Sequence, residues 1–496
     1  MARVLKILIA SLILFMTHVG AWAQMPIKLQ VAPQVDPDSV DLAYYGKKHF
    51  WRAAGTVVGF NIGLWAFDRY VQNGDFARIS LHSVKENFKH GFKWDNDKLG
   101  TNMFLHPYNG NLFYNAARSN GYNYWQSGLF AIGGSAMWEM FMECEYPSTN
   151  DIIATPIGGM AIGEVCYRAS DAVLDDRSTG GERVRREVAA FLISPMRGLT
   201  RIINGDAWRK RSTTGRQFGT PSVAMEFSAG IRGLEFENEV YDSSLGFSMQ
   251  FNLEYGDRFE VKSTHPYDYF RVRADINIVN SQPLLGQLDI TGRLIARELL
   301  EKERSHMSIG LYQHFDYYDS DTISEVSAKC PYKLGIPASL GCGLMFRDIE
   351  RNRWVLDAYL HSNAVILGSV LSDYYKVDER NYNLASGFSI KGGANMGFNR
   401  DKFSASLSHA YYRLFTWKGY HQYSDLDNIS YKVLDAQGDH SVASFIVTEA
   451  RCDLKLWRKL YLTLSFTHYM RSTHYHDFGH IKSSSMATRL MLTYKL

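Results

Sequence analysis

Alternation of apolar and polar residues dominates the chain from about residue 217 to its end. In the segment 247–255, apolar side chains occupy every second position from Phe247 to Tyr255, and polar side chains occupy the positions between them. Successive side chains of a strand point to opposite faces, so this two-residue period predicts β-strands. The predicted strands lie near 219–230, 244–255, 268–279, 284–297, 305–317, 335–347, 353–366, 383–390, 391–399, 403–415, 443–455, 458–470 and 486–496.

These strands predict an antiparallel transmembrane β-barrel at 216–496. The stretch 383–399 reads as either one strand or two. Because single-chain bacterial barrels have even strand numbers, we expect about twelve strands, with fourteen as the alternative. A soluble β-sandwich is the competing interpretation, since alternation alone does not distinguish lipid from a protein core.

The first half of the mature chain, 46–210, has a helical pattern instead. Helices are expected over about 47–71, 108–121 and 122–145, from Pro156 with Thr155 as N-cap, and along the amphipathic stretch 182–203. Glycines recur at four-residue spacing, as in Gly55, Gly59 and Gly63, which predicts close helix packing. The fold class is therefore α+β, with a helical domain on the periplasmic side of the barrel or inside it as a plug.

The N-terminus and the composition point to an exported membrane protein. Residues 1–23 have a positive start at Arg3 and Lys6, a short apolar run and an Ala21-Trp22-Ala23 cleavage site, which is typical of a signal peptide. A polar linker is expected at 24–45. The net charge of +3 is close to neutral and does not indicate nucleic-acid binding. Mean hydropathy of −0.24 excludes a polytopic helical membrane protein, and 30 tyrosines suit the aromatic girdles of a barrel.

Cysteine and histidine spacing offers two weaker signals. Of the five cysteines, Cys330 and Cys342 are close enough in sequence to form a disulfide across a loop. His474 and His476, expected in a loop after the penultimate strand, could chelate a transition metal. The ordinary readings are small buried thiols and solvated histidines.

The richest polar cluster lies between His106 and Arg168. Glu139 and Glu143 share a stripe of an otherwise apolar helix, where carboxylates are costly unless partnered. Around them lie His106, Tyr114 and Arg118, then Asn150, Asp151 and Arg168.

These residues resemble the family known as domain of unknown function 3943, over about residues 80–190. The resemblance rests on His106-Pro107, Gly110, Tyr114-Asn115-Ala116-Ala117-Arg118, Ser135, Trp138-Glu139, Glu143, Asn150-Asp151, Thr155, Gly158-Gly159 and Gly163-Glu164. It implies an exported envelope protein with a β-rich C-terminal region and no assigned activity. The spacing is also distantly similar to that of VanZ-like membrane proteins.

Three readings of the cluster remain open. In a catalytic reading, Glu139 is a general base, Glu143 or Asp151 raises its pKa, His106 shuttles protons, and Arg118 or Arg168 holds an anion, with Tyr114 and Asn150 as further ligand contacts. In a metal reading, His106, Glu139, Glu143 and Asp151 hold an ion. In a structural reading, Glu139 and Glu143 pair with Arg118 and Arg168, and Asn150 and Asp151 cap a helix. Ser135 is a minor nucleophile candidate.

For function, the sequence supports three hypotheses. The first is an outer-membrane barrel that is surrounded by outer-membrane lipid and is either gated by the helical domain or docked to a periplasmic protein. The second is an envelope lipid- or glycan-modifying enzyme that uses the carboxylate cluster. The third is a soluble secreted β-rich binding protein. Cofactor and substrate are not specified by the sequence.

Overall fold

The computed structural model describes residues 46–95, 97–236, 239–240, 245–261, 265–279, 282–320, 330–350, 353–375, 380–399, 402–417, 419, 435 and 437–496. The signal peptide and linker predictions lie outside these residues. The chain divides into two compact units. The helical unit holds 46–93 and 106–222, and the barrel unit holds 94–105 and 223–496. The segment 94–105, expected within the helical domain, thus belongs with the barrel.

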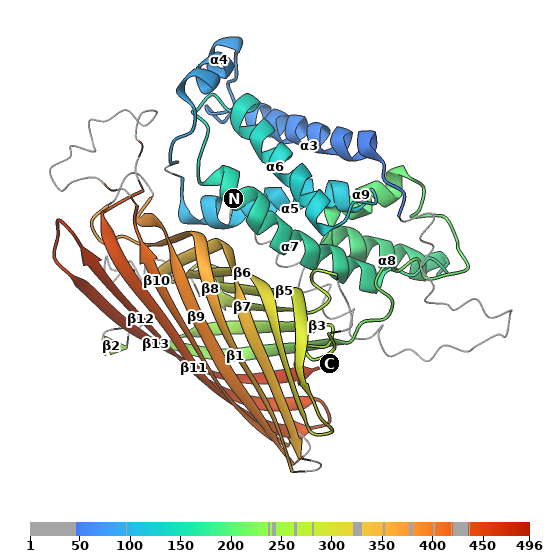
Figure 1. Cartoon of the computed structure of the whole chain (residues 1–496), viewed down its shortest axis with the longest axis vertical. Helices are drawn as coiled ribbons and strands as arrows, with labels where there is room; N and C mark the ends of the chain where they lie inside the picture. Colours follow the sequence, from blue (N-terminus) through green and yellow to red (C-terminus); the bar gives the residue numbers. More distant parts are fainter. Residues whose placement is uncertain are drawn as a thin grey trace. The chain divides into compact units, whose positions relative to one another are not determined.

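The helical unit contains the predicted helices with shifted boundaries (Figure 1). Among the described helices, none combines the length and apolar character needed to cross a membrane. The helices are α3 (Phe50–Tyr70), α4 (Leu81–His90), α5 (His106–Arg118), α6 (Tyr124–Phe141), α7 (Asp151–Val173), α8 (Gly180–Ile193) and α9 (Pro195–Ile203).

Two helix predictions are corrected. The helix expected to start at Pro156 begins at Asp151, because Asn150 takes the N-cap position and an aspartate in the first turn suits the helix dipole. The stretch 182–203 is two helices, α8 and α9, because Pro195 has no N–H to continue α8 and starts α9 instead.

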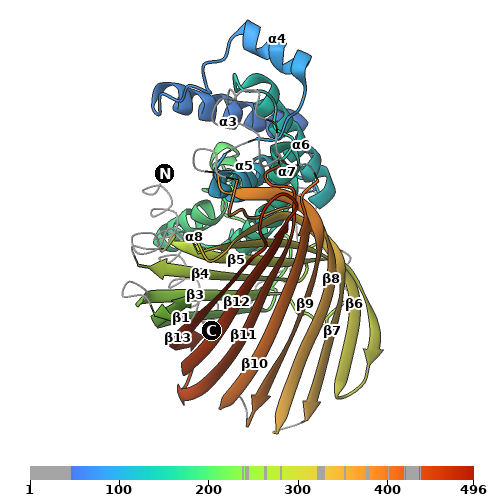
Figure 2. The same cartoon turned by 90° about the vertical axis from the view of Figure 1, so that its left-hand side faces the viewer.

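The β-region is a closed antiparallel ring of twelve strands, since β13 pairs back with β1 (Figure 2). A two-residue strand, β2 (Glu239–Val240), is attached to the end of β1. The stretch 383–399 is a single strand. The ring consists of β1 (Val223–Phe236), β3 (Gly246–Tyr255), β4 (Phe270–Ile278), β5 (Leu285–Glu301), β6 (Ser305–Asp319), β7 (Lys333–Glu350), β8 (Trp354–Leu371), β9 (Tyr382–Phe398), β10 (Phe403–Phe415), β11 (Ser441–Trp457), β12 (Leu460–Tyr475) and β13 (Ile481–Lys495).

The barrel has the reverse polarity of a soluble β-protein. Along β12, Thr463, Ser465 and Thr467 are fully buried, whereas the alternating Leu464 and Phe466 are about two-fifths exposed. The same arrangement continues on β13, which exposes apolar side chains and buries polar ones. A soluble sandwich would bury its apolar face, so that alternative is wrong. Apolar side chains outside and polar ones inside are typical of a transmembrane barrel.

One end of the lumen is filled by a core of apolar side chains, many of them aromatic. Its members come from β1 and from β6 through β13, with Tyr332 just before β7, so they can meet only inside the ring. Tyr332 stacks on Tyr469, with ring centroids 4.2 Å apart, and Tyr318 and Tyr412 pack on Phe445. This lumen core is contributed by the wall itself.

Ion pairs across the lumen fill much of the remaining interior. Arg273 on β4 pairs with Glu449 on β11, which lies on a distant part of the ring. Arg489 on β13 lies 3.1 Å from Asp275 on β4, and Lys391 on β9 contacts Asp316 on β6. Among the described residues, a cavity of about 70 Å³ remains beside these pairs, room for only a few waters.

The segment 94–105 packs on the outer wall of the barrel. Asn102 Nδ2 donates to the Tyr382 hydroxyl at 2.8 Å, and that hydroxyl donates to the Asp97 carbonyl at 2.6 Å. Phe104 packs on Tyr317, which lies on the face opposite the lumen-facing Tyr318. This part of the wall is covered by protein.

The cysteine and histidine predictions also change. All five cysteines are free, so the suggested Cys330–Cys342 disulfide is wrong; Cys342 lies exposed on β7. His474 lies within β12, paired with Val442, and only His476 follows the strand. The group of potential metal ligands found in the described part of the chain lies elsewhere, in the helical unit.

Candidate functional site

Helices α5 and α7 are held together by glycines. A Cβ placed on Gly110 would lie 1.8 Å from the Thr155 carbonyl oxygen, and one on Gly159 would meet the backbone of Gly110. Gly163 leaves the same kind of space for the Tyr114 ring. The two helices therefore run side by side in the same direction. Polar side chains cluster at both ends of this helix pair. The two ends of α5, His106 and Arg118, are about 18 Å apart along the helix axis, at 1.5 Å per residue.

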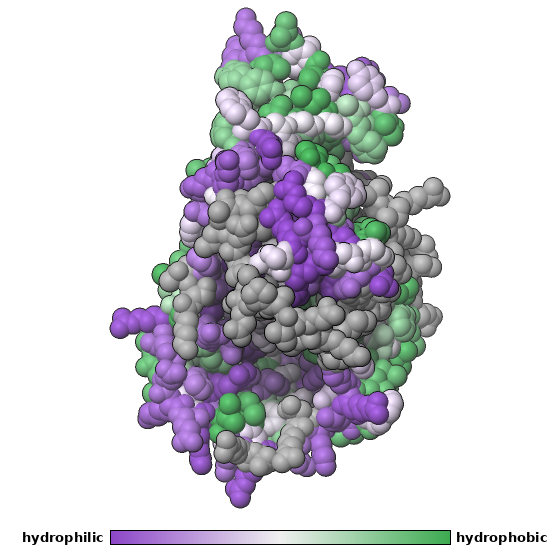
Figure 3. Space-filling model, turned by 90° about the vertical axis from the view of Figure 1, so that its right-hand side faces the viewer, coloured by the Kyte–Doolittle hydropathy of each residue, from purple (hydrophilic) through white to green (hydrophobic). Residues whose placement is uncertain are grey.

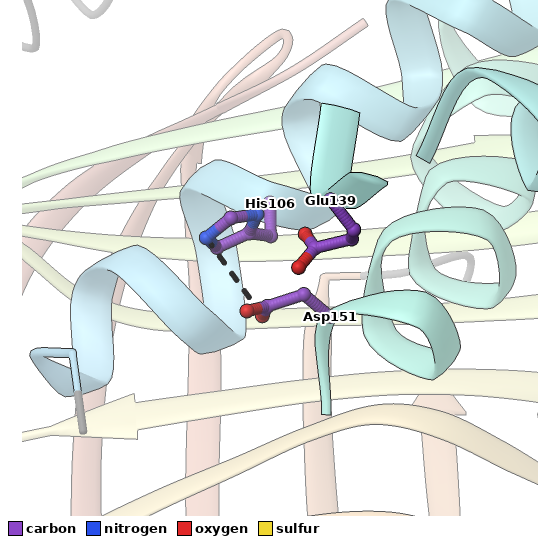
Figure 4. Close-up of side chains that lie close together, drawn as sticks. All are labelled: His106, Glu139 and Asp151. Carbon is purple, nitrogen blue, oxygen red and sulfur yellow. Dashed lines mark ion pairs between the residues drawn. The ribbon is translucent and has the colours of Figure 1, made fainter. Parts of the chain in front are cut away.

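The first cluster lies where α5 and α7 begin and consists of His106, Glu139 and Asp151 (Figure 4). One ligand atom from each lies within 4.8 Å of the others. His106 Nε2 is 3.7 Å from Asp151 Oδ1, and the Glu139 carboxylate points toward both. Glu139 and Asp151 are buried, whereas an edge of His106 reaches the surface. We call these three residues the carboxylate cluster.

Backbone and polar groups fix both carboxylates in place. The Ser148 N–H donates to Glu139 Oε2 at 2.7 Å, and Asn150 Nδ2 donates to Asp151 Oδ1 at 3.0 Å. The Asp151 N–H donates to Ser148 Oγ, and Ser135 Oγ donates to the Asp151 carbonyl. The turn 147–151 thus links Glu139 on α6 to the start of α7.

Glu143 lies outside the carboxylate cluster. The prediction put it on the same helix stripe as Glu139, but α6 ends at Phe141, so the stripe is broken. The Glu143 carboxylate instead accepts a hydrogen bond from the Trp138 indole N–H. Asn87 also donates to the Glu143 backbone carbonyl at 3.2 Å. These contacts place Glu143 beyond the end of the helix.

The second cluster lies where α5 ends and centres on Glu164. Arg118 donates to both Glu164 oxygens at 2.9 and 3.1 Å, Arg168 donates at 2.9 Å, and the Tyr114 hydroxyl donates at 2.6 Å. The structural reading expected these arginines to pair with Glu139 and Glu143. Glu164 takes both because it lies one helical turn before Arg168 and faces Arg118 across the α5–α7 contact.

Burial and charge act in opposite directions on Glu164. Burial alone would raise the pKa of its carboxyl, but Arg118, Arg168 and the Tyr114 hydrogen bond outweigh burial, so the pKa lies below its usual value. Burial, with Glu164 beside it, holds the pKa of Tyr114 well above its usual value. This cluster is a compensated ion-pair network.

The structure thus divides the predicted site residues between two places. His106, Glu139 and Asp151 come together with Asn150 in support, and Tyr114, Arg118 and Arg168 come together around Glu164. The sequence signal for Glu164 was its spacing, four residues before Arg168 and within the Gly163-Glu164 motif.

Comparison with known proteins covers the two regions separately. Residues 91–196 match the family model "Domain of unknown function (DUF3943)", which confirms the resemblance. No curated protein matches.

Solved structures similar to the β-region include the NanC porin, with 7% identity, TM-score 0.26, and coverage of 55% of this chain and 100% of that one. An outer-membrane channel from Pseudomonas putida F1 has 9% identity, TM-score 0.26, and coverage of 56% and 95%. The Pseudomonas putida toluene transporter TodX has 9% identity, TM-score 0.22, and coverage of 55% and 89%. These low values assign no function to the chain.

Proposed function

We propose that this chain is an outer-membrane protein whose closed barrel anchors a metal-dependent hydrolase of an envelope lipid or glycan. The apolar outer face of the barrel supports the location, because such a face is stable only against lipid. The filled lumen supports an anchoring role over free diffusion of solutes. The observation that carries the activity is the carboxylate cluster, with three ligand atoms within 4.8 Å.

The donor set suits a divalent ion such as Zn²⁺ or Mn²⁺. One imidazole nitrogen and two carboxylate oxygens match the borderline character of these ions, and three protein ligands leave a position open. Such an ion, when bound, activates water and polarises a substrate oxygen. Thr155, one turn after Asp151, has a buried hydroxyl without a hydrogen-bond partner in the described part of the chain, which an incoming oxygen would satisfy.

The protein groups around the cluster have distinct roles in this proposal. Glu139 and Asp151 supply the negative charge that attracts the ion. Ser148 and Asn150 hold these two carboxylates in fixed orientations, so that little reorganisation accompanies binding. The partly exposed edge of His106 gives the route by which water and substrate reach the cluster.

The test compares cells that lack the protein with cells complemented by wild type, Glu139→Gln or Glu143→Gln. Envelope lipids and glycans are measured by mass spectrometry. We expect one species to accumulate alike in the deletion strain and with Glu139→Gln, and to return to normal with Glu143→Gln, the matched control outside the cluster. If Glu139→Gln restores the wild-type envelope at equal protein abundance, the enzymatic proposal is wrong.

A gated pore is the second candidate, supported by the ring of twelve strands. Planar-bilayer recordings distinguish it from an anchor. Because the lumen is filled by the strands' own side chains, we expect no stepwise conductance from the full chain. The gating hypothesis predicts conductance that rises when 46–205 is deleted, whereas the filled lumen predicts that the barrel stays silent.

A further inference from the structure

A basic cavity in the helical unit lies away from the carboxylate cluster. Its volume is about 510 Å³, within the usual range for small-molecule sites. It is lined by Ser119 to Gly121, which follow the end of α5, and by residues of α3, α7 and α9. Five cationic side chains but only one acidic side chain, Asp206, line it: Lys47, Arg52, Arg197, Arg201 and Arg209.

Three of these cations have acidic partners, and Arg209 lies 4.0 Å from Asp206. Arg197 pairs with Asp171 and donates to the Tyr167 carbonyl, and Arg201 donates to Glu187 at 2.8 Å. These contacts build a rigid wall. Neither Lys47 nor Arg52 has an acidic partner among the described residues, and Arg52 reaches across to Asn204 Oδ1 at 2.9 Å.

The positive charge around the cavity affects the pKa of His49, which lines it. Burial, Arg52 and Lys47, in that order, lower the pKa of His49. Lys47 and Arg52, which have no acidic partner among the described residues, favour an anionic ligand with oxygen acceptors, because a guanidinium group binds such oxygens in pairs.

The elements that line the cavity also expose apolar side chains on their other faces, and we call these side chains the rim. Helix α9 buries Arg197 and Arg201, at 3% and 5% exposure, and exposes Leu199, Ile202 and Ile203. A surface helix in water has the opposite arrangement.

Exposed aromatic side chains continue this rim. Phe50 and Trp51 precede Arg52 on α3, and Trp208 precedes Arg209. Trp51 and Trp208 are 84% and 71% exposed. Figure 3 shows hydrophobic side chains interspersed with hydrophilic ones over the upper part of that view.

We propose that this cavity binds the phosphate-bearing headgroup of an anionic membrane lipid, with the acyl chains lying against Ile202, Ile203, Trp51 and Trp208. The cations supply charge complementarity for the phosphate, and the exposed apolar rim supplies surface for the chains. Free phosphate would use the cations alone and leave the rim in water. Aromatic residues beside cations are typical of the lipid interface.

This site is separate from the proposed hydrolase centre. The carboxylate cluster begins at His106, at the opposite end of α5 from Asn120, about 18 to 21 Å away along the axis. A phosphate held in the basic cavity therefore does not contact Glu139. The site binds or positions lipid, and its failure can be measured apart from that of the enzyme.

The test uses the full-length protein in nanodiscs. Native mass spectrometry after transfer to detergent measures retained lipid for discs of phosphatidylglycerol and of phosphatidylcholine. The variants are the double substitution Lys47→Gln/Arg52→Gln, the control Arg69→Gln on the same helix outside the cavity, and Glu139→Gln. Thermal unfolding establishes that each variant is folded, and inorganic phosphate is added as a competitor.

We expect anionic lipid to be retained by wild type, Arg69→Gln and Glu139→Gln, and reduced about tenfold or more by the double substitution, as for loss of one charge-assisted contact. An Ile202→Ser/Ile203→Ser variant should weaken lipid retention while leaving the cations intact. The proposal is overturned if all variants retain equal amounts of lipid, or if both lipids are retained equally. It is also overturned if millimolar inorganic phosphate displaces the lipid and the isoleucine changes have no effect.

Discussion

The two ends of the α5–α7 pair carry similar residue types in opposite electrostatic states. At the Glu164 end, two arginines and a tyrosine hydroxyl surround one carboxylate. At the His106 end, two carboxylates meet one histidine, and the ion pair of Asp151 with His106 is longer, at 3.7 Å. Among the described residues, the first end joins two cations and a hydroxyl to one acid, and the second joins one imidazole to two acids.

In the proposed function, this difference separates a structural role at the Glu164 end from a metal-binding role at the His106 end. A carboxylate saturated by buried arginines has no capacity left for a ligand, and its pKa lies below the usual range. Two carboxylates that converge on a histidine instead match the needs of a cation. Burial of ionisable groups therefore does not by itself indicate chemistry; the balance of charge around them does.

The largest expected effect comes from Glu164→Gln. The substitution leaves Arg118 and Arg168 buried without their carboxylate, which destabilises by about 3–5 kcal/mol for a broken buried pair. Thermal unfolding of the full chain, followed by the helical circular dichroism signal, measures it. Glu143→Gln is the matched control and should stay close to wild type; equal losses in both variants would contradict the special role of Glu164.

A smaller effect is expected from the glycines between the two ends. Gly110→Ala places a methyl group against the Thr155 carbonyl and should cost about 1–3 kcal/mol or more by overpacking. Gly55→Ala on α3 meets no atom within 4 Å and should be neutral or stabilise by about 0.5–1 kcal/mol. Urea unfolding of both variants tests the contrast, which fails if Gly110→Ala is tolerated as well as Gly55→Ala.

The Glu164 network should also give acid sensitivity. Because its pKa is lowered on folding, its contribution to stability is present above the ordinary value of 4.5 and is lost as the pH falls through the lower folded pKa. Unfolding of wild type and Glu164→Gln from pH 7 to pH 3 should therefore show a stability gap that narrows toward acid. A gap that is constant with pH would mean that the charge of Glu164 is not what stabilises the unit.

The smallest stability effect is expected at the other end. Glu139→Gln keeps an oxygen acceptor for the Ser148 N–H, so we expect less than about 1.5 kcal/mol of destabilisation in metal-free buffer. With metal present, wild type should gain thermal stability and Glu139→Gln should not. The same melting experiment, with and without Zn²⁺, shows whether the two ends differ as described.

The sequence predicted the barrel well because its information is local. The period of two along each strand gave the twelve-stranded ring, with β10 matching its predicted bounds at 403–415. Most of the other strands extend beyond their predicted bounds at one end or both, whereas β3 and β4 are shorter than predicted. The Arg273–Glu449 pair was not predictable, because it joins distant strands and depends on ring closure and tilt.

The sequence predicted which residues form the polar sites, but not that they separate into two clusters. Spacing placed Glu139 and Glu143 on one stripe, and only the end of α6 at Phe141 separates them. Glu164 was named within the motif but not as the partner of both arginines, since that pairing depends on the parallel approach of α5 and α7 at Gly110. The basic cavity, built from α3, α7, α9 and the residues after α5, has no local sequence signal beyond the amphipathic stretch 182–203.

Metal binding by the full-length protein in detergent tests the central claim most directly. After chelation and equilibration with Zn²⁺ or Mn²⁺, ion content is measured by inductively coupled plasma mass spectrometry, with calorimetry for affinity. We predict one ion per chain in wild type and Glu143→Gln, and its loss in Glu139→Gln and Asp151→Asn. Chains that bind no ion, or that keep it equally in Glu139→Gln, would contradict the assignment and return His106, Glu139 and Asp151 to helix packing.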